Sequence, residues 1–208
     1  MDAETPRPLV HIIDDDTGLC EALVRLVRSV GLEGRAYNSV QGFLAAPPEN
    51  VPSCILLDVR LPDMSGLDLQ DSLVRRGLPL PVVMMTGYGD IPMSVRAMKA
   101  GAVDFLPKPF RDQDLLDAVE RALARDRKQI GIRVEQEQLN AKFAALTLRE
   151  QEVFQGIMDG LMNREIAERL SLSLATVKAH RGALTRKMGV ANAADLVRFG
   201  RLLDLVRD

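Results

Sequence analysis

Acidic and hydroxyl side chains, together with one lysine, stand at or just beyond the ends of several short apolar runs in this sequence. Three aspartates at residues 14–16 follow the first run, and later runs are closed or followed by Asp58, Thr86 and Lys108. If the runs are parallel strands, all of these side chains meet at one edge of a sheet, where α/β proteins bind their ligands. The pattern therefore predicts a polar site at that edge.

The residue types at this edge favour phosphoryl chemistry. Crowded carboxylates repel one another unless a cation compensates, and Mg²⁺ prefers carboxylate and carbonyl oxygens. An aspartate carboxylate can act as a nucleophile and form an acyl phosphate, while a lysine and a metal ion neutralise the transferred charge. The simpler alternative is that each acid only caps a helix or a turn, and Asp16 is expected to cap the helix that follows it.

Five apolar runs are the expected strands, at residues 9–13, 33–37, 54–57, 82–85 and 103–106. They alternate with segments of helical periodicity at residues 17–30, 39–45, 67–76 and 93–100, and from residue 115 onward. In the first of these segments Leu19, Ala22 and Leu26 belong to the apolar stripe. The alternation predicts a doubly wound α/β fold, in which helices cover both faces of a five-stranded parallel sheet.

Length and composition limit the class of protein. The chain has 208 residues, of which 47% are hydrophobic and 27% charged, so one or two folded domains are expected and wholesale disorder is excluded. The two cysteines, Cys20 and Cys54, are isolated, no secretory signal is visible, and no apolar run reaches the ~18 residues of a membrane span. These features predict a protein of the reducing cytoplasm that has no disulfide and does not engage a membrane.

The last third of the chain is helical in pattern. Residues 124–145 have mixed charge and predict a helical linker. Thr147 and Glu150 form a capping box at the start of the next helix. Asn163 is expected to cap a second helix, and Gly189 to end a third before a fourth begins. The sequence therefore predicts a small all-α domain of four helices after the sheet domain.

A basic cluster lies on the third of these helices. Val177, Leu184 and Met188 share its buried face, and residues 171–190 hold four basic side chains and no acid: Lys178, Arg181, Arg186 and Lys187. A helix face of this kind suits the major groove of DNA. On charge alone, an ordinary solvated helix face is the favoured interpretation.

Residues 9–125 resemble the receiver domain of two-component response regulators, which has a CheY-like fold. The resemblance is carried by Asp14-Asp15, Leu57-Asp58, Pro62-Asp63-Met64-Ser65-Gly66, Met85-Thr86-Gly87, Met98-Lys99-Ala100-Gly101-Ala102, Asp104-Phe105 and Lys108-Pro109-Phe110. It implies that Asp58 accepts a phosphoryl group from a histidine kinase. It also implies a Mg²⁺ ion held by Asp15, by Asp58 and by the main-chain carbonyl of Arg60, with Asp14 acting through a bound water.

The same resemblance implies a switch. Thr86 and Lys108 would contact the phosphoryl oxygens, and the Lys108-Pro109 peptide would be cis. As Thr86 moves towards the phosphoryl group, Phe105 would rotate inward and repack the surface around residues 93–110, where family members dimerise. The alternative for Phe105 is that it is an ordinary core aromatic residue at the end of a strand and takes no part in a switch.

Residues 146–207 resemble the LuxR-type helix-turn-helix domain. The matching residues are Leu146-Thr147-Leu148-Arg149-Glu150, Gly160, Asn163-Arg164-Glu165-Ile166-Ala167, Leu170, Thr176-Val177-Lys178-Ala179-His180 and Lys187-Met188-Gly189-Val190. Together the two resemblances identify the chain as similar to transcription regulators of the FixJ/NarL type. The expected domains are a receiver at residues 9–125, a helical linker at 126–141 and the DNA-binding domain at 142–207.

The second resemblance implies that Thr176 and Lys187 contact the DNA backbone, that Lys178 reads base edges, and that residues 192–203 form a dimer helix. The full set of expected DNA contacts is Asn163, Arg164, Thr176, Lys178, Ala179, Arg181, Arg186 and Lys187. The expected partners are a sensor histidine kinase, promoter DNA, a second copy of the chain after phosphorylation, and RNA polymerase. The chain is expected to catalyse nothing beyond its own phosphorylation and dephosphorylation.

Two other functions are alternatives to that of a phosphorylation-controlled transcription regulator. An aspartate-nucleophile phosphatase of the haloacid dehalogenase type also places paired aspartates after a strand, but Thr17 falls one position early for that motif and Asp58 would have no purpose. A protein-interaction module would use the helical domain to bind a protein in place of DNA. Covalent phosphate on Asp14 would favour the phosphatase, and steeply salt-dependent binding to duplex DNA would exclude the interaction module.

Overall fold

The computed structural model describes residues 7–46, 49–78, 80–87, 91–190 and 193–204. The chain forms two compact units, Met1–Ile130 and Gly131–Asp208. Among the helices of the described residues, none combines the length and the apolarity that crossing a membrane requires.

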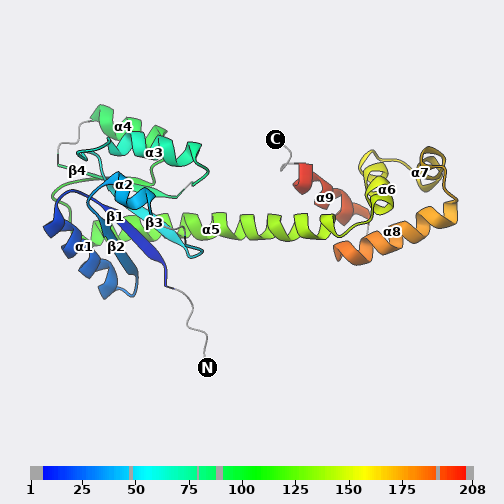
Figure 1. Cartoon of the computed structure of the whole chain (residues 1–208), viewed down its shortest axis with the longest axis horizontal. Helices are drawn as coiled ribbons and strands as arrows, with labels where there is room; N and C mark the ends of the chain where they lie inside the picture. Colours follow the sequence, from blue (N-terminus) through cyan, green and yellow to red (C-terminus); the bar gives the residue numbers. More distant parts are fainter. Residues whose placement is uncertain (1–6, 47–48, 79, 88–90, 191–192, 205–208) are drawn as a thin grey trace, which may run out of the picture. The chain divides into compact units, whose positions relative to one another are not determined.

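The first unit alternates strands and helices. Its elements are β1 Leu9–Ile13, α1 Thr17–Ser29, β2 Glu33–Tyr37, α2 Val40–Leu44, β3 Ser53–Asp58, α3 Gly66–Arg75, β4 Val82–Thr86, α4 Ile91–Lys99, β5 Asp104–Pro107 and the beginning of α5 Asp112–Ala144. The strands form one parallel sheet in the order β2-β1-β3-β4-β5. The predicted fold class is confirmed, and all five strands end at the same edge (Figure 1).

Both faces of the sheet are covered because alternate residues of the central strands face opposite layers. Ile12 and Leu56 belong to a cluster formed with α1 and α5, whereas Ile13 and Leu57 belong to a second cluster formed with α2, α3 and α4. All four side chains are fully buried. Burial on both faces explains why these strands appear in the sequence as continuous apolar runs.

Several element ends differ from the predictions by one or two residues, among them those of α4, β5 and β3. Helix α4 begins at Ile91, two residues before the expected start, because Pro92 is tolerated in the first turn of a helix. Strand β5 is displaced by one residue towards Pro107. On α1, Leu19 and Leu26 are only half-buried and Ala22 is exposed, so part of the predicted apolar stripe lies outside the core.

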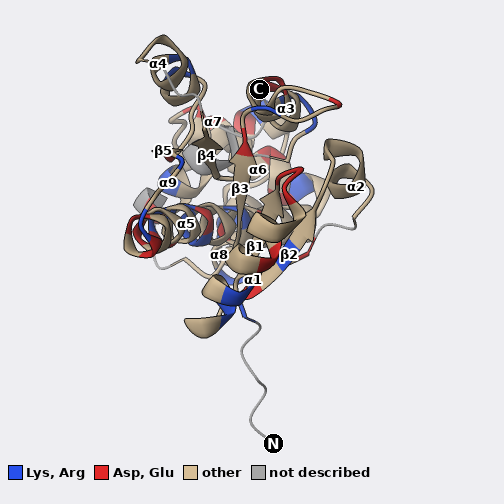
Figure 2. Ribbon diagram, turned by 90° about the vertical axis from the view of Figure 1, so that its left-hand side faces the viewer, with Lys and Arg blue, Asp and Glu red and all other residues tan. Residues whose placement is uncertain are grey.

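Residues 126–141, the expected linker, are helical and lie within α5. Its first part packs on the sheet through apolar residues such as Leu115 and Val119. The buried Asp126 carboxylate accepts a 2.8 Å hydrogen bond from the main-chain N–H of Ser53, which ties α5 to the beginning of β3. Both acidic and basic residues are seen on α5 in Figure 2.

The second unit is built from the end of α5 and from α6 Leu148–Met158, α7 Asn163–Leu170, α8 Leu174–Met188 and α9 Ala193–Asp204. A compact apolar core holds these helices together, with Val153, Val177 and Leu184 fully buried. The predicted four helices are confirmed. Asn192, the expected first residue of the dimer helix, lies outside the described residues.

The helix ends of this unit follow the predicted chemistry at two of three positions. The capping box of Thr147 and Glu150 is present at α6, and Gly189 ends α8 in the left-handed region at φ 70°. The prediction that Asn163 caps α7 is wrong: Met162 is the N-cap residue, and its N–H donates to the Glu165 carboxylate at 2.6 Å. The Asn163 side chain is therefore available for a contact elsewhere.

Candidate functional site

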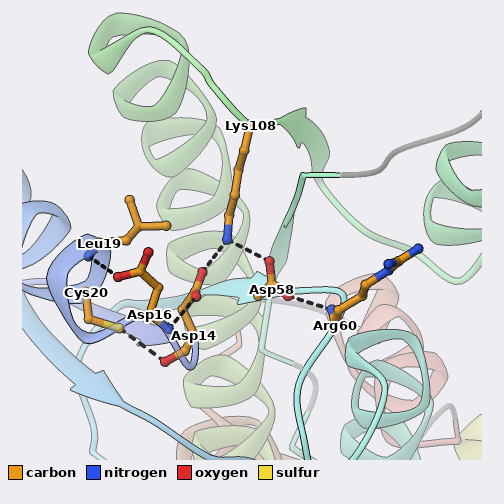
Figure 3. Close-up of polar contacts among 7 residues, drawn as sticks. All are labelled: Asp14, Asp16, Leu19, Cys20, Asp58, Arg60 and Lys108. Atoms are coloured by element: carbon orange, nitrogen blue, oxygen red, sulfur yellow. Dashed lines mark hydrogen bonds and ion pairs between the residues drawn. The ribbon is translucent and has the colours of Figure 1, made fainter.

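Three side chains from different strand ends converge at the carboxyl edge of the sheet (Figure 3). The Lys108 ammonium, beyond β5, donates to Asp14 Oδ2 at 2.6 Å and to Asp58 Oδ1 at 2.7 Å. Asp14 and Asp58 are 1% and 5% exposed. One cation thus joins two buried carboxylates that are 44 positions apart in the sequence, which bears out the predicted gathering of these residues.

The loop after β1 positions Asp14. Its Oδ1 accepts from the Asp16 N–H at 3.0 Å, and its main-chain oxygen lies 3.4 Å from Cys20 Sγ. Asp16 caps α1 as predicted, because its side chain accepts from the Leu19 N–H at 2.9 Å. Asp15, between the two, has an exposed side chain.

The loop after β3 positions Asp58. Asp58 Oδ2 accepts a 2.6 Å hydrogen bond from the Arg60 N–H, while the Arg60 side chain points away from the carboxylate (Figure 3). Residues Arg60 and Ser65 form an isolated bridge, and α3 begins at Gly66 directly against the strand. A Cβ at position 66 would lie 2.4 Å from the Asp58 main-chain oxygen, so the chain passes Asp58 too closely for any side chain.

Burial and charge shape the electrostatics of the site. Burial raises the pKa of Asp14 above its usual value, although the hydrogen bond from Lys108 opposes this shift. Burial alone would lower the pKa of Lys108, but the hydrogen bonds to Asp14 and Asp58 outweigh it and raise the pKa. Burial also raises the pKa of the Cys20 thiol to about 11, so this cysteine stays a neutral thiol.

The oxygen donors at this edge fit a hard divalent cation. Asp14 and Asp58 contribute two carboxylates against the single charge of Lys108, so negative charge remains to be balanced. Among the described residues, no group of three potential metal-ligating side chains converges. The structure therefore brings together Asp14 and Asp58 of the expected ligand set, and leaves the Asp15 side chain exposed beside them.

The two expected switch residues lie on neighbouring strands. Thr86 ends β4 and is 1% exposed, and its main-chain oxygen accepts from the Lys108 N–H at 2.7 Å. Phe105 lies on β5 opposite Met84 and packs, half-buried, against the cluster formed with α3 and α4. The Lys108-Pro109 peptide is cis, as expected.

A pocket of about 550 Å³ opens beside this site, between α1 and the segment after β5. Its apolar lining includes Leu19, Leu26 and Phe110, with Lys108 at its wall. The sequence pattern assigned Leu19 and Leu26 to the core, because helical periodicity identifies an apolar face but not what covers it.

The expected DNA-contacting residues lie in the second unit, on α7 and α8. Most of them are exposed: Arg164, Lys178, Ala179, Arg186 and Lys187. Thr176 is half-buried at the start of α8, where its N–H and hydroxyl contact Ser173 Oγ at 3.0 and 2.7 Å. Asn163 and Arg181 contact each other, since Arg181 Nη1 donates to Asn163 Oδ1 at 2.7 Å.

Glu150 is a residue near this surface whose contact the sequence did not predict. Its carboxylate accepts from Lys187 Nζ at 2.7 Å, and the hydrogen bonds from Lys187 and from the Thr147 N–H lower the pKa of Glu150 to about 2. The capping-box pattern located Glu150 on α6, but no pattern links it to a lysine 37 positions away.

Two family models match the chain. The model described as "Response regulator receiver domain" matches residues 10–120, and the model described as "Bacterial regulatory proteins, luxR family" matches residues 144–199. The first match covers the sheet and both loops that carry Asp14 and Asp58. The second covers the capping box of α6 and the whole of α8.

Individual relatives are similar over nearly the whole chain. "Nodulation protein W" of Bradyrhizobium diazoefficiens is 46% identical over 96% of this chain and 88% of its own length. "Transcriptional regulatory protein FixJ" of Azorhizobium caulinodans is 39% identical over 93% and 92%. The solved structure of the response regulator StyR aligns with a TM-score of 0.83 at 42% identity, over 94% of this chain and 99% of that one. This chain therefore belongs to the two-component response regulators that join a receiver domain to a LuxR-type DNA-binding domain.

Proposed function

We propose that Asp58 is the phosphoryl acceptor and that its phosphorylation by a sensor histidine kinase controls DNA binding. The observation that carries the proposal is the Lys108 ammonium, which lies 2.7 Å from Asp58 and 2.6 Å from Asp14. In the transfer, an Asp58 carboxylate oxygen attacks phosphorus, and the bond from phosphorus to the donor imidazole breaks with its electron pair staying on nitrogen. Lys108 is placed to neutralise charge on the transferred group.

Mg²⁺ is the cofactor that we assign to this site. Asp15, Asp58 and the main-chain carbonyl of Arg60 would hold the ion, and Asp14 would act through a bound water. When bound, the ion supplies positive charge to the phosphoryl oxygens during transfer. The excess of carboxylates over cations at this edge supports the assignment.

The switch would run from Thr86 to Phe105. A phosphoryl group on Asp58 adds acceptor oxygens at the edge where Thr86 ends β4. Thr86 would close on these oxygens, and the half-buried Phe105 would rotate into the space left behind. The surface around residues 93–110 would then dimerise with a second copy of the chain.

DNA recognition is assigned to α7 and α8 of the second unit. Lys178, Ala179 and Arg186 lie on the exposed side of α8, where base edges would be read, while Arg164, Thr176 and Lys187 would contact phosphates. Asn163 and Arg181 complete the surface through their mutual hydrogen bond. The bound dimer would act on RNA polymerase at a promoter, in the cytoplasm.

The domain limits proposed for this function are a receiver at residues 9–125, a helical linker at 126–141 and a DNA-binding domain at 142–207. The receiver would catalyse only its own phosphorylation and dephosphorylation at Asp58. The division of the fold after Ile130 supports assigning the two activities to separate units.

Phosphorylation is expected to tighten DNA binding by the full chain. With a small-molecule phosphodonor and Mg²⁺, we expect affinity for the preferred duplex to rise by at least about tenfold, about 1.4 kcal/mol. Fluorescence anisotropy with and without the phosphodonor measures the change. Equal affinities in the two states would contradict the switch, and turnover of a phosphate ester without Asp58 labelling would favour a phosphatase instead.

The pocket beside Lys108 is suited to docking the kinase, because a donor must reach Asp58 from the same edge. An exposed small residue in its lining, Ala22, lies between Leu19 and Leu26 on successive turns of α1. Replacing Ala22 by glutamate would put a charge into an apolar contact. We expect phosphotransfer from the cognate kinase to slow about tenfold or more, as for a truncated interface anchor.

Phosphorylation of the Ala22→Glu variant by a small-molecule donor provides the control. Such a donor needs no docking surface, so its rate of labelling Asp58 should equal that of the unchanged chain. Equal slowing with both donors would mean that the variant perturbs the Asp58 site and would contradict the docking assignment.

A further inference from the structure

The Glu150 carboxylate accepts hydrogen bonds both at the beginning of α6 and from the end of α8. It accepts from the Thr147 N–H at 2.7 Å, which completes the capping box of α6, and its Oε2 also accepts from Lys187 Nζ at 2.7 Å, in the last turn of α8. The ammonium lies 3.4 Å from the main-chain oxygen of Ala145 as well. The beginning of α6 and the end of α8 are thus joined through one charged contact.

The two partners differ in exposure. The Glu150 side chain is 6% exposed, whereas that of Lys187 is 39% exposed. An ammonium has three N–H donors, and two of them are directed at Glu150 and Ala145. Within the described part of the chain no acceptor is found for the third, and the Lys187 side chain is partly exposed. The hydrogen bonds from Lys187 and from the Thr147 N–H lower the pKa of Glu150 to about 2, so the carboxylate is charged throughout the physiological range.

We infer that Glu150 is a positioning residue for DNA binding: it holds the Lys187 ammonium in place so that its remaining donor meets a DNA phosphate. The inference rests on the proposed phosphate contact of Lys187. A free lysine side chain loses much rotamer freedom when it binds, and a lysine ordered beforehand avoids that loss. For Glu150 to act in this way, this benefit must exceed the repulsion between Glu150 and the phosphate, and the sign of the change in affinity of Glu150→Gln tests that balance.

Glu150→Gln separates this role from the capping role. Glutamine at this position of a capping box still accepts from the Thr147 N–H, but it has no charge to hold Lys187. The matched control is Glu152→Gln, which removes an equal charge from the same helix. Glu152 pairs with Arg149 at the surface and does not touch Lys187. Far-UV circular dichroism and thermal unfolding verify that both variants fold.

The assay is binding of the full chain to a mixed-sequence duplex oligonucleotide over a range of salt, since phosphate contacts are independent of sequence. We expect Lys187→Ala to weaken binding about tenfold, as for one lost charge-assisted contact, and to reduce the salt slope by about 0.9. Glu150→Gln should weaken binding about threefold and have no further effect in the Lys187→Ala background. Glu152→Gln should leave binding unchanged or slightly tighter.

Each other outcome overturns the inference. Tighter binding by Glu150→Gln than by Glu152→Gln would mean that the carboxylate only masks the lysine. An unchanged affinity would mean that Lys187 needs no positioning, and an equal loss in the Lys187→Ala background would mean a general structural effect. Arg164→Ala in the same assay tests the proposed DNA surface itself, because Arg164 is also assigned to phosphates: if it weakens binding while Glu150→Gln does not, only the inference about Glu150 fails.

Discussion

We expect the Asp58→Asn substitution to abolish covalent phosphoryl uptake by the full chain. An amide nitrogen and oxygen replace the carboxylate, so the side chain cannot act as a nucleophile. After incubation with a small-molecule phosphodonor and Mg²⁺, mass spectrometry of proteolytic fragments should find the phosphoryl adduct on Asp58 in the unchanged chain and none in the variant. The loss should be complete within detection, and with it the gain in DNA affinity.

The Asp58→Asn variant should keep its fold. The asparagine oxygen can still accept from the Arg60 N–H, and the change removes one of two carboxylates that repel each other beside Lys108. The matched control is Asp63→Asn, an exposed aspartate of the same loop whose carboxylate accepts from the Gln41 N–H. Retained labelling of the Asp58→Asn variant, or loss of labelling in the control, would mean that the acceptor is misassigned.

Lys108→Met should destabilise the receiver domain strongly. Methionine preserves most of the side-chain volume but leaves Asp14 and Asp58 buried with no countercharge. Removing one partner of a buried ion pair costs about 3–5 kcal/mol, and the lower value is expected here because Lys108 remains 22% exposed. Urea unfolding of the full chain can follow this domain alone, since the sequence has no tryptophan and both tyrosines, Tyr37 and Tyr88, precede residue 125.

The pH dependence of that variant has a definite sign. Lys108 opposes the burial that raises the pKa of Asp14, so its loss should raise this pKa further. A carboxyl whose pKa is higher in the folded state binds more protons there than in the unfolded chain, so stability falls as pH rises. The variant should therefore be more stable in mild acid than at neutral pH, relative to the unchanged protein. Lys99→Met, at an exposed position on α4, should show neither effect.

Residue patterns identify the sheet edge well, because a strand that is buried on both faces appears in the sequence as a continuous apolar run. Leu56 and Leu57 face opposite apolar layers, so β3 is a continuous apolar run and the polar Asp58 marks its end. A parallel sheet then predicts that Asp58 lies near Asp14, even when no individual contact is known. The direct contacts of Lys108 with both carboxylates depend on the conformation of the loop after β5. The periodicity of the sequence does not predict that conformation.

Contacts between distant residues were the main features that the sequence could not predict. The ion pair of Glu150 with Lys187 depends on how α6 packs against α8. Asn163 looked like a helix cap because of its residue type, yet Glu165 satisfies the helix start and Asn163 bonds to Arg181. In each case the residue type correctly predicted a side chain that forms polar contacts, but the packing of the helices determines which residue it contacts.

The close passage of the beginning of α3 over the end of β3 bears on how this protein can evolve. Gly66 is required for space and not for an unusual backbone angle, because the obstacle to a Cβ is the main-chain oxygen of Asp58 itself. No compensating change of a neighbouring side chain can relieve that obstacle. A larger residue at position 66 is therefore excluded in any descendant that retains the same path of β3 and α3.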